Sequence, residues 1–214
     1  MFKSKKPSVK RMQKLRLSDY WKSTEQIRMI RAHIEQEMAE GSKCLMVTSP
    51  EESKDRSLIV SKLSMAFAEQ GKKVLLVDAN VRSPSLHYWF QVDNLYGWTT
   101  ALLMNQTPDL YIQDTFQPRL SLLTAGHLTQ KPSRVWISDK IKEWVQEMRQ
   151  DFDLILFETP PLLSVADPQI LMNHCDGVIL VACSNQSKRE EIALTKHTID
   201  RANKPTVGVI LQTG

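Results

Sequence analysis

Residues 43–57 read KCLMVTSPEESKDRS, and this stretch decides the fold. Its first seven residues, 43–49, form an apolar run that is typical of a buried strand. A polar loop follows, and residues 57–70 have the pattern of a helix. A strand that runs into a loop and then into a helix is the setting of a nucleotide-binding P-loop.

Strands and helices alternate along the rest of the chain. The other expected strands are short apolar runs at 72–78, 120–124, 152–158, 177–183 and 206–211. The other expected helices are at 23–40, 84–90, 97–104, 132–149, 166–173 and 187–203. Continuous apolar strands that alternate with helices favour a parallel sheet covered on both faces. We therefore expect an α/β fold with a mostly parallel twisted sheet and helices on both faces, similar to the P-loop NTPases.

Three polar features follow the expected strands. They are the loop 49–57, Asp78 and Glu158. In open α/β sheets the ligand crevice lies beyond the carboxyl ends of the strands, so we expect the functional site there. The alternative for the two acids is that each carboxylate simply turns into solvent at the end of its strand.

Length and composition are those of one ordinary domain. The chain has 214 residues, 42% of them apolar, which is too few for two comfortable domains. We expect a basic, flexible segment over residues 1–21 and a single P-loop-like domain over residues 22–214. No apolar run approaches the roughly 20 residues that span a bilayer, and nothing resembles a signal peptide. Three cysteines in or beside strand-like runs indicate reduced thiols in a cytosolic protein.

The net charge of +4 hides an asymmetry. Residues 1–16 carry seven Lys or Arg and no acid, which leaves 21 basic and 24 acidic residues elsewhere. The segment is either a solvated tail or a contact to the anionic inner leaflet, at about 1 kcal/mol per basic residue. No nucleic-acid module accompanies it, so nucleic acid is not an expected partner.

The loop lacks the residues on which a P-loop depends. Glycines let backbone N–H groups curl around the phosphates, a Lys reaches the terminal phosphates, and a Ser or Thr hydroxyl holds Mg²⁺. None of the seven glycines lies in residues 49–57. Ser57 keeps a hydroxyl at the start of the helix, where it is equally well explained as an N-cap.

Six further segments carry a family resemblance. They are VTSP at 47–50, GKKVLLVDANVRSPSLH at 71–87, LTAG at 123–126, DFDLILFETPP at 151–161, DPQIL at 167–171 and DGVILV at 176–181. Taken in order, they closely resemble the bacterial tyrosine kinases (BY-kinases) of capsule and exopolysaccharide synthesis. The likeness runs from about residue 22 to 212. It implies a membrane-embedded polysaccharide chain-length regulator as the partner.

The resemblance also shows where the loop departs from the family pattern, Ser-x-x-Pro-Gly-x-Gly-Lys-Ser. The family's glycines fall on Ser53 and Asp55, with Lys54 between them. Its lysine falls on Arg56 and its serine on Ser57. These five residues would form a vestigial nucleotide-binding loop.

The acidic positions differ as well. Asp78 matches the first of two family aspartates, the second is Asn80, and Glu158 stands where the family has a magnesium-site aspartate. The family's Asn-Pro-x-Glu reads KPSR at 131–134, and its terminal tyrosine cluster has no counterpart after Tyr111. The resemblance therefore makes Asp78 and Glu158 the only catalytic candidates, and Ser57, Asp78 and Glu158 the Mg²⁺ ligands if a nucleotide binds.

These departures carry a physical cost. If the loop geometry were retained, each non-glycine in a left-handed conformation would cost roughly 1–2 kcal/mol. The Asp55 carboxylate would repel a phosphate by on the order of 4 kcal/mol at about 4 Å and an effective dielectric near 20. At about 1.4 kcal/mol per decade, binding would weaken by several powers of ten. We expect no resident cofactor, with ATP and Mg²⁺ at most weakly bound.

One family feature is kept. Glu25, Arg28 and Arg31 match a Glu-x-x-Arg-x-x-Arg motif through which, by resemblance, these kinases assemble into rings. At spacings of three they predict a charged stripe along one helix flank, able to meet a neighbour's carboxylates. The alternative is an ordinary solvated helix face.

Three functions fit this pattern. The favoured one is a non-catalytic or weakly nucleotide-binding regulator in capsular or exopolysaccharide biosynthesis, cytoplasmic or at the inner face of the membrane. It would form homo-oligomers or co-assemble with an intact kinase. The second is an active tyrosine kinase with an atypical loop, in which Arg56 or Lys54 replaces the usual lysine. The third is a scaffold of the wider partitioning-type ATPase class.

Overall fold

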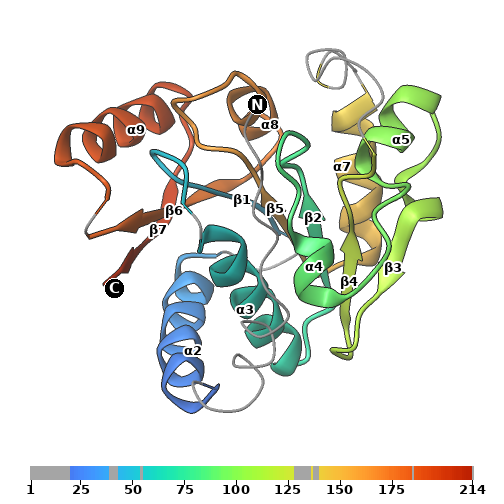
Figure 1. Ribbon diagram of the computed structural model, residues 1–214, viewed down its shortest axis with the longest axis horizontal. Helices are drawn as coiled ribbons and strands as arrows, with labels where there is room; N and C mark the ends of the chain where they lie inside the picture. Colours follow the sequence, from blue (N-terminus) through green and yellow to red (C-terminus); the bar gives the residue numbers. More distant parts are fainter. Residues whose placement is uncertain are drawn as a thin grey trace.

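A seven-stranded sheet forms the centre of the molecule (Figure 1). The computed structural model describes residues 20–38, 43–53, 55–127, 136, 140–184 and 186–213. The strand order is β3-β4-β2-β5-β1-β6-β7, and every neighbouring pair is parallel except β3 with β4. The strands are β1 (Lys43–Thr48), β2 (Val74–Asp78), β3 (Ile112–Asp114), β4 (Leu120–Leu123), β5 (Leu154–Glu158), β6 (Gly177–Cys183) and β7 (Thr206–Gln212). The predicted α/β class with a mostly parallel sheet is confirmed.

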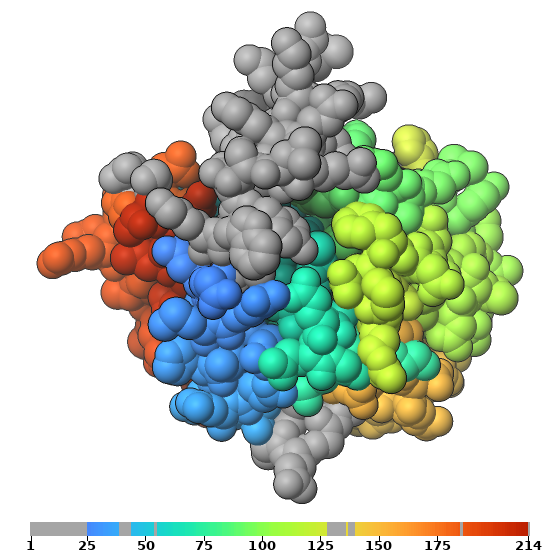
Figure 2. Space-filling view, turned by 90° about the horizontal axis from the view of Figure 1, so that it is seen from below, coloured from blue at the N-terminus to red at the C-terminus, as the bar shows by residue number. Residues whose placement is uncertain are grey.

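Helices cover both faces of this sheet. One layer consists of α2 (Tyr20–Glu37), α3 (Arg56–Glu69) and α4 (Leu86–Phe90). The other consists of α5 (Trp98–Met104), α7 (Lys140–Asp151), α8 (Asp167–Met172) and α9 (Arg189–Arg201). A short 3₁₀ turn, η1 (Pro108–Tyr111), leads into β3. The space-filling view shows α2 and α3 side by side on one surface (Figure 2).

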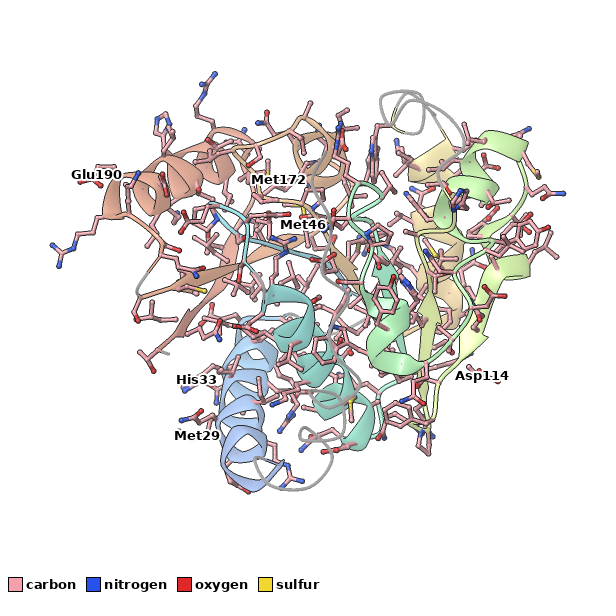
Figure 3. All side chains as sticks on the ribbon, in the orientation of Figure 1. Met29, His33, Met46, Asp114, Met172 and Glu190 are labelled. Carbon is pink, nitrogen blue, oxygen red and sulfur yellow. The ribbon has the colours of Figure 1, made fainter. Side chains whose placement is uncertain are left out.

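Alternate residues of each strand enter different cores. In β1, Leu45 and Val47 pack with α2 and α3, whereas Cys44 and Met46 pack with the helices of the opposite layer. Met46 and Met172 therefore lie in the interior, while Asp114 and Glu190 project outward (Figure 3). Because both faces are buried, the strands read as continuous apolar runs rather than as an alternating pattern.

Most expected elements lie where the sequence places them, with a few differences. The first helix spans Tyr20–Glu37 rather than 23–40. The helix expected at 132–149 is described as Lys140–Asp151, and the 131–134 segment lies outside the described residues. The turn η1 and the antiparallel edge strand β3 were not predicted. None of the described helices combines the length and apolar character that crossing a bilayer requires.

Two glycines allow the start of α5 to lie directly on the chain that leaves β4. The Trp98 amide donates to Thr124 O over 2.8 Å, and the Thr99 amide donates to Ala125 O over 2.9 Å. A Cβ on Gly97 would stand 2.1 Å from Thr124 O and 2.7 Å from the Gly126 amide nitrogen. Only a residue without a side chain fits this approach.

We expect Gly97→Ala to lower the free energy of unfolding by roughly 1–3 kcal/mol, the usual range for overpacking a tight site. Urea denaturation measures this loss. Gly208→Ala is the matched control, because its Cβ would meet only Ile34 Cγ1 at an ordinary 3.5 Å. Equal stability of the two variants would contradict the expectation.

Candidate functional site

A buried ion pair joins the start of α3 to the end of β5. Arg56, the first residue of α3, is 2% exposed, and Glu158, the last residue of β5, is 1% exposed. Arg56 Nε donates to Glu158 Oε1 over 2.7 Å, and Arg56 Nη1 donates to Ser49 Oγ over 2.7 Å. The guanidinium is therefore directed into the protein, where its charge is neutralised.

Glu158 has a second oxygen that this pair does not use. Oε2 is buried and has no hydrogen-bond partner within the described part of the chain. Burial raises the pKa of Glu158, while the charge and hydrogen bond of Arg56 act in the opposite direction. The charge and hydrogen bond of Arg56 thus favour the ionised form of a carboxylate that burial disfavours.

Asp78 lies beside this pair. It ends β2 and is the register partner of Glu158, and it is fully buried. One of its oxygens accepts backbone N–H groups of Ser85 and Leu86, each over 3.0 Å, at the start of α4. Asp78 therefore closes the first turn of α4, and the interpretation that Asp78 and Glu158 turn into solvent is wrong.

Of the two buried carboxyl groups, Glu158 is the one that pairs with Arg56. Burial and the nearby Glu158 charge raise the pKa of Asp78 to about 8, although three backbone N–H donors oppose the shift. Asp78 therefore holds a proton at neutral pH while Glu158 pairs with Arg56. A protonated carboxyl is a poor ligand for a metal ion, because metal binding requires the ionised form.

The two residues at the family's glycine positions have partners on distant strands. Ser53 Oγ lies 3.5 Å from Cys183 Sγ at the end of β6. Asp55 Oδ2 accepts the Gln212 side-chain amide of β7 over 2.9 Å. Asp55 has φ −108°, and Ser53 is not among the described residues with positive φ. Neither residue is in the left-handed region, so the cost expected if the glycine-loop geometry were retained does not arise here. Lys54 lies outside the described residues.

Ser57 lies inside the first turn of α3. Asp55 is the N-cap residue of this helix, so the interpretation of Ser57 as the N-cap is wrong. The Ser57 hydroxyl is nearly buried and accepts the indole N–H of Trp89 over 3.1 Å. Trp89 could not be anticipated from the sequence, because nothing in the residues around it links α4 to the loop.

A second ion pair at this edge was also missed. Arg82 donates to both carboxylate oxygens of Asp167, over 2.7 and 3.1 Å, and Asp167 is 3% exposed. The pair joins the loop after β2 to the start of α8. Both residues fall in segments quoted for the family resemblance, which was the available signal.

The α2 motif is only partly exposed. Glu25 and Arg28 lie on the surface and contact each other at 3.3 Å, and Arg28 also approaches Glu69 at 3.6 Å. Arg31 is 7% exposed and pairs with Glu35 at 2.5 Å. The expected continuous stripe thus has two outward members, since Arg31 turns toward its own chain.

Comparisons with known proteins agree with this fold. The family described as Cellulose biosynthesis protein BcsQ matches residues 53–204. The tyrosine-protein kinase YwqD of Bacillus subtilis (strain 168) is 35% identical over 88% of this chain and 80% of its own length. The tyrosine-protein kinase CpsD of Streptococcus agalactiae serotype III (strain NEM316) is 29% identical over 89% of this chain and 82% of its own. This chain belongs to the BY-kinase family.

A solved structure of a relative has the same fold. The crystal structure of the chimerical protein CapA2B2 superposes with a TM-score of 0.84 at 26% identity, covering 94% of this chain and 88% of that one. By the resemblance described above, the Arg56–Glu158 contact of this chain joins the positions that correspond to the family's Lys and Asp. Within the described residues, no group of three or more His, Cys, Asp or Glu could hold a metal ion.

The proton on Asp78 predicts how stability changes with pH. Its pKa of about 8 lies above the ordinary 3.8, so the folded chain holds a proton that the unfolded chain releases. This stabilisation is complete below about pH 4 and is lost as pH rises through about 8, at up to about 1.4 kcal/mol per pH unit. In Asp78→Asn this part of the slope should disappear, as measured by urea denaturation from pH 5 to 9. The exposed Asp93→Asn is the control, and identical slopes for D78N and wild type would refute the assignment.

The buried pair predicts a large penalty for removing one partner. Arg56→Met leaves Glu158 without its counter-charge, so we expect a loss of roughly 3–5 kcal/mol. Adding Glu158→Gln to this variant should recover part of the loss, because no buried charge remains. Lys196→Met breaks the exposed pair with Asp200 and should change little. Chemical denaturation of the four proteins tests this, and a mild R56M with no recovery in the double variant would contradict it.

Proposed function

We propose that this chain is a non-catalytic or weakly nucleotide-binding BY-kinase homologue that regulates capsular or exopolysaccharide biosynthesis. The observation that carries the proposal is the buried contact of Arg56 Nε with Glu158 Oε1. Arg56, at the family's lysine position, pairs with a carboxylate inside the protein, so its charge is not directed at a phosphate. The family match to a cellulose biosynthesis protein supports the polysaccharide context.

Nucleotide binding would have to compete with this arrangement. A phosphate that drew Arg56 outward would leave Glu158 as an uncompensated buried charge, which costs several kcal/mol. It would also meet the Asp55 carboxylate at the start of α3, where phosphates bind helix N-termini. That repulsion is on the order of 4 kcal/mol at about 4 Å and an effective dielectric near 20.

The Mg²⁺ ligands offered by the resemblance fit the ion poorly as they stand. The Ser57 hydroxyl accepts from Trp89, the pKa of Asp78 is about 8, and Glu158 pairs with Arg56. Magnesium prefers several ionised oxygen ligands in near-ideal octahedral geometry. We therefore propose no resident nucleotide or metal, and weak ATP–Mg²⁺ binding at most.

The proposed role is one of assembly. Through the family resemblance, the partner is a membrane-embedded polysaccharide chain-length regulator, and the chain works at the inner face of the cell membrane. The exposed Glu25 and Arg28 support homo-oligomers or co-assembly with an intact kinase. Residues 1–16, with seven basic residues and no acid, would add contact to anionic lipid.

Calorimetric titration with ATP–Mg²⁺ and with a non-hydrolysable analogue tests the proposal. The wild-type chain should give no heat at several hundred micromolar nucleotide. A variant with S53G, D55G, R56K and E158D restores the family pattern and should gain Mg²⁺-dependent binding. The surface substitution Lys62→Ala is a control for charge changes outside the loop.

One outcome would overturn the proposal, and another would change only the explanation for the lost binding. Micromolar binding by the wild-type chain together with tyrosine labelling would establish the active-kinase alternative. In that case Arg56→Ala should abolish the labelling. Failure of both the wild type and the restored variant to bind would mean that residues other than these four prevent binding.

A further inference from the structure

The loop between β1 and α3 is hydrogen-bonded to β7, the outermost strand of the sheet. Gln212, the last residue of β7, uses both ends of its side-chain amide. Its Nε2 donates to Asp55 Oδ2 over 2.9 Å, and its Oε1 lies 3.3 Å from Cys183 Sγ. The same sulfur lies 3.5 Å from Ser53 Oγ. Two loop residues separated by one position are thus joined to the ends of β6 and β7.

The contacts use groups that a glycine loop would not have. Ser53 supplies a hydroxyl and Asp55 a carboxylate at the two positions where the family pattern has glycine. Their partners are 130 and 157 residues away in the sequence. The substitutions that remove backbone freedom from the loop therefore also supply its attachment to the sheet.

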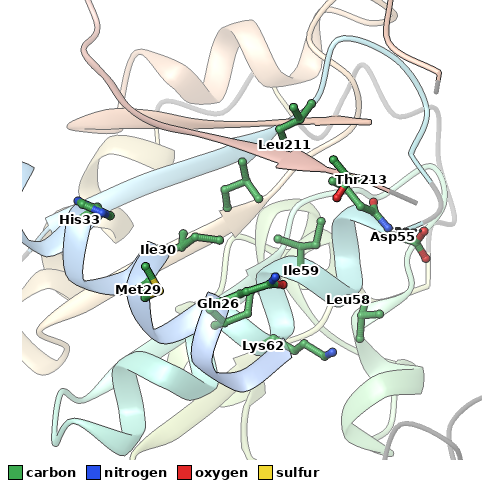
Figure 4. A pocket seen from close by; sticks show the side chains of 13 residues that line it. Gln26, Met29, Ile30, His33, Asp55, Leu58, Ile59, Lys62, Leu211 and Thr213 are labelled. Atoms are coloured by element: carbon green, nitrogen blue, oxygen red, sulfur yellow. Dashed lines mark hydrogen bonds between the residues drawn. The ribbon is translucent and has the colours of Figure 1, made fainter. Parts of the chain in front are cut away.

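The strand that carries Gln212 lies at the edge of the molecule. β7 pairs only with β6, where Gln212 is the register partner of Cys183. Its outer side borders a groove of about 510 Å³ between α2, α3 and β7 (Figure 4). Asp55 and Gln212 both line this groove, next to Leu211, which is 58% exposed. A displacement of the end of β7 would therefore act directly on the loop.

We propose that Gln212 and Cys183 form a latch that holds Ser53 and Asp55 against the sheet edge. The latch rests on the proposed function, in which the loop is a structural element rather than a phosphate cradle. When the end of β7 moves, Ser53 and Asp55 lose these contacts to the sheet, and the loop before α3 gains freedom while Arg56 stays paired with Glu158. The sheet edge thereby controls the state of the vestigial site.

The single partly exposed thiol in the described chain reports on the latch. Cys44 and Cys175 are buried, whereas Cys183 has intermediate exposure. Burial also raises the pKa of Cys44 well above its ordinary value, so its thiol stays unreactive. With 5,5′-dithiobis(2-nitrobenzoate) as the probe, Cys183 should react first, and the two buried thiols serve as an internal control for global unfolding.

Three variants distinguish an effect on the loop from a local change in the exposure of Cys183. Gln212→Ala removes both contacts, and Gln212→Glu keeps the size but places a carboxylate against Asp55. Gln186→Ala removes an exposed glutamine from the turn just after Cys183 and is the matched control. We expect Q212A to speed both Cys183 labelling and amide hydrogen exchange over residues 49–57 by about fivefold to tenfold, the effect of losing one or two hydrogen bonds. Q212E should exceed Q212A, with a gain that shrinks at high salt.

Hydrogen exchange of the loop decides the proposal. Faster Cys183 labelling with unchanged loop exchange would mean only local exposure of the sulfur and would overturn the latch, as would an equal effect of Q186A. Neither readout involves nucleotide. Micromolar ATP binding with tyrosine labelling by the wild-type chain would therefore refute the proposed function without changing the latch result. Unchanged hydrogen exchange of the loop in Q212A would refute the latch and say nothing about kinase activity.

Discussion

The buried contact between Arg56 and Glu158 organises the carboxyl edge of the sheet. Arg56 is the first residue of α3 and Glu158 the last of β5, so the pair sets where the helix begins relative to the central strands. Ser49, at the start of the loop, accepts a hydrogen bond from the same guanidinium. Since removing either charge would leave the other buried without a partner, the helix, the strand and the loop are held as one unit.

The same contact explains the state of Asp78. Three ionisable groups meet in the interior, and the Arg56 guanidinium pairs with one of the two carboxyl groups, Glu158. Glu158 pairs with that charge, burial and the nearby Glu158 raise the pKa of Asp78 to about 8, and Asp78 Oδ2 accepts the backbone N–H groups of Ser85 and Leu86. A carboxyl at a strand end thus acts as a cap for α4, which is a structural use of a position that the family resemblance marks as functional.

The fold could be predicted from sequence because its signals are local. Apolar runs such as residues 74–77 and 154–157 stay apolar throughout only when both sheet faces are covered, which predicts a parallel α/β sheet. Strand β3 escaped because Ile112–Asp114 has three residues and only one of them is apolar. The meeting of Asp78, Glu158 and the loop at one sheet edge could be predicted, since parallel strand ends converge there, but their hydrogen-bond partners could not. The partners of Arg56, Ser53 and Asp55 lie 102, 130 and 157 residues away, and no local pattern encodes such pairs.

The departures from the family pattern are best understood as one coupled change. Glu has one methylene more than Asp, and the guanidinium of Arg extends further than the ammonium of Lys, so both exchanges lengthen the side chains that meet in this structure at 2.7 Å. Ser53 and Asp55 meanwhile supply the side-chain groups that fasten the loop to β6 and β7. Residues that share partners in this way do not contribute additively. A lysine placed alone at position 56 would lose the forked contact to Ser49 and Glu158 without gaining the glycine-lined space that a phosphate needs, so each replacement makes physical sense only beside the others.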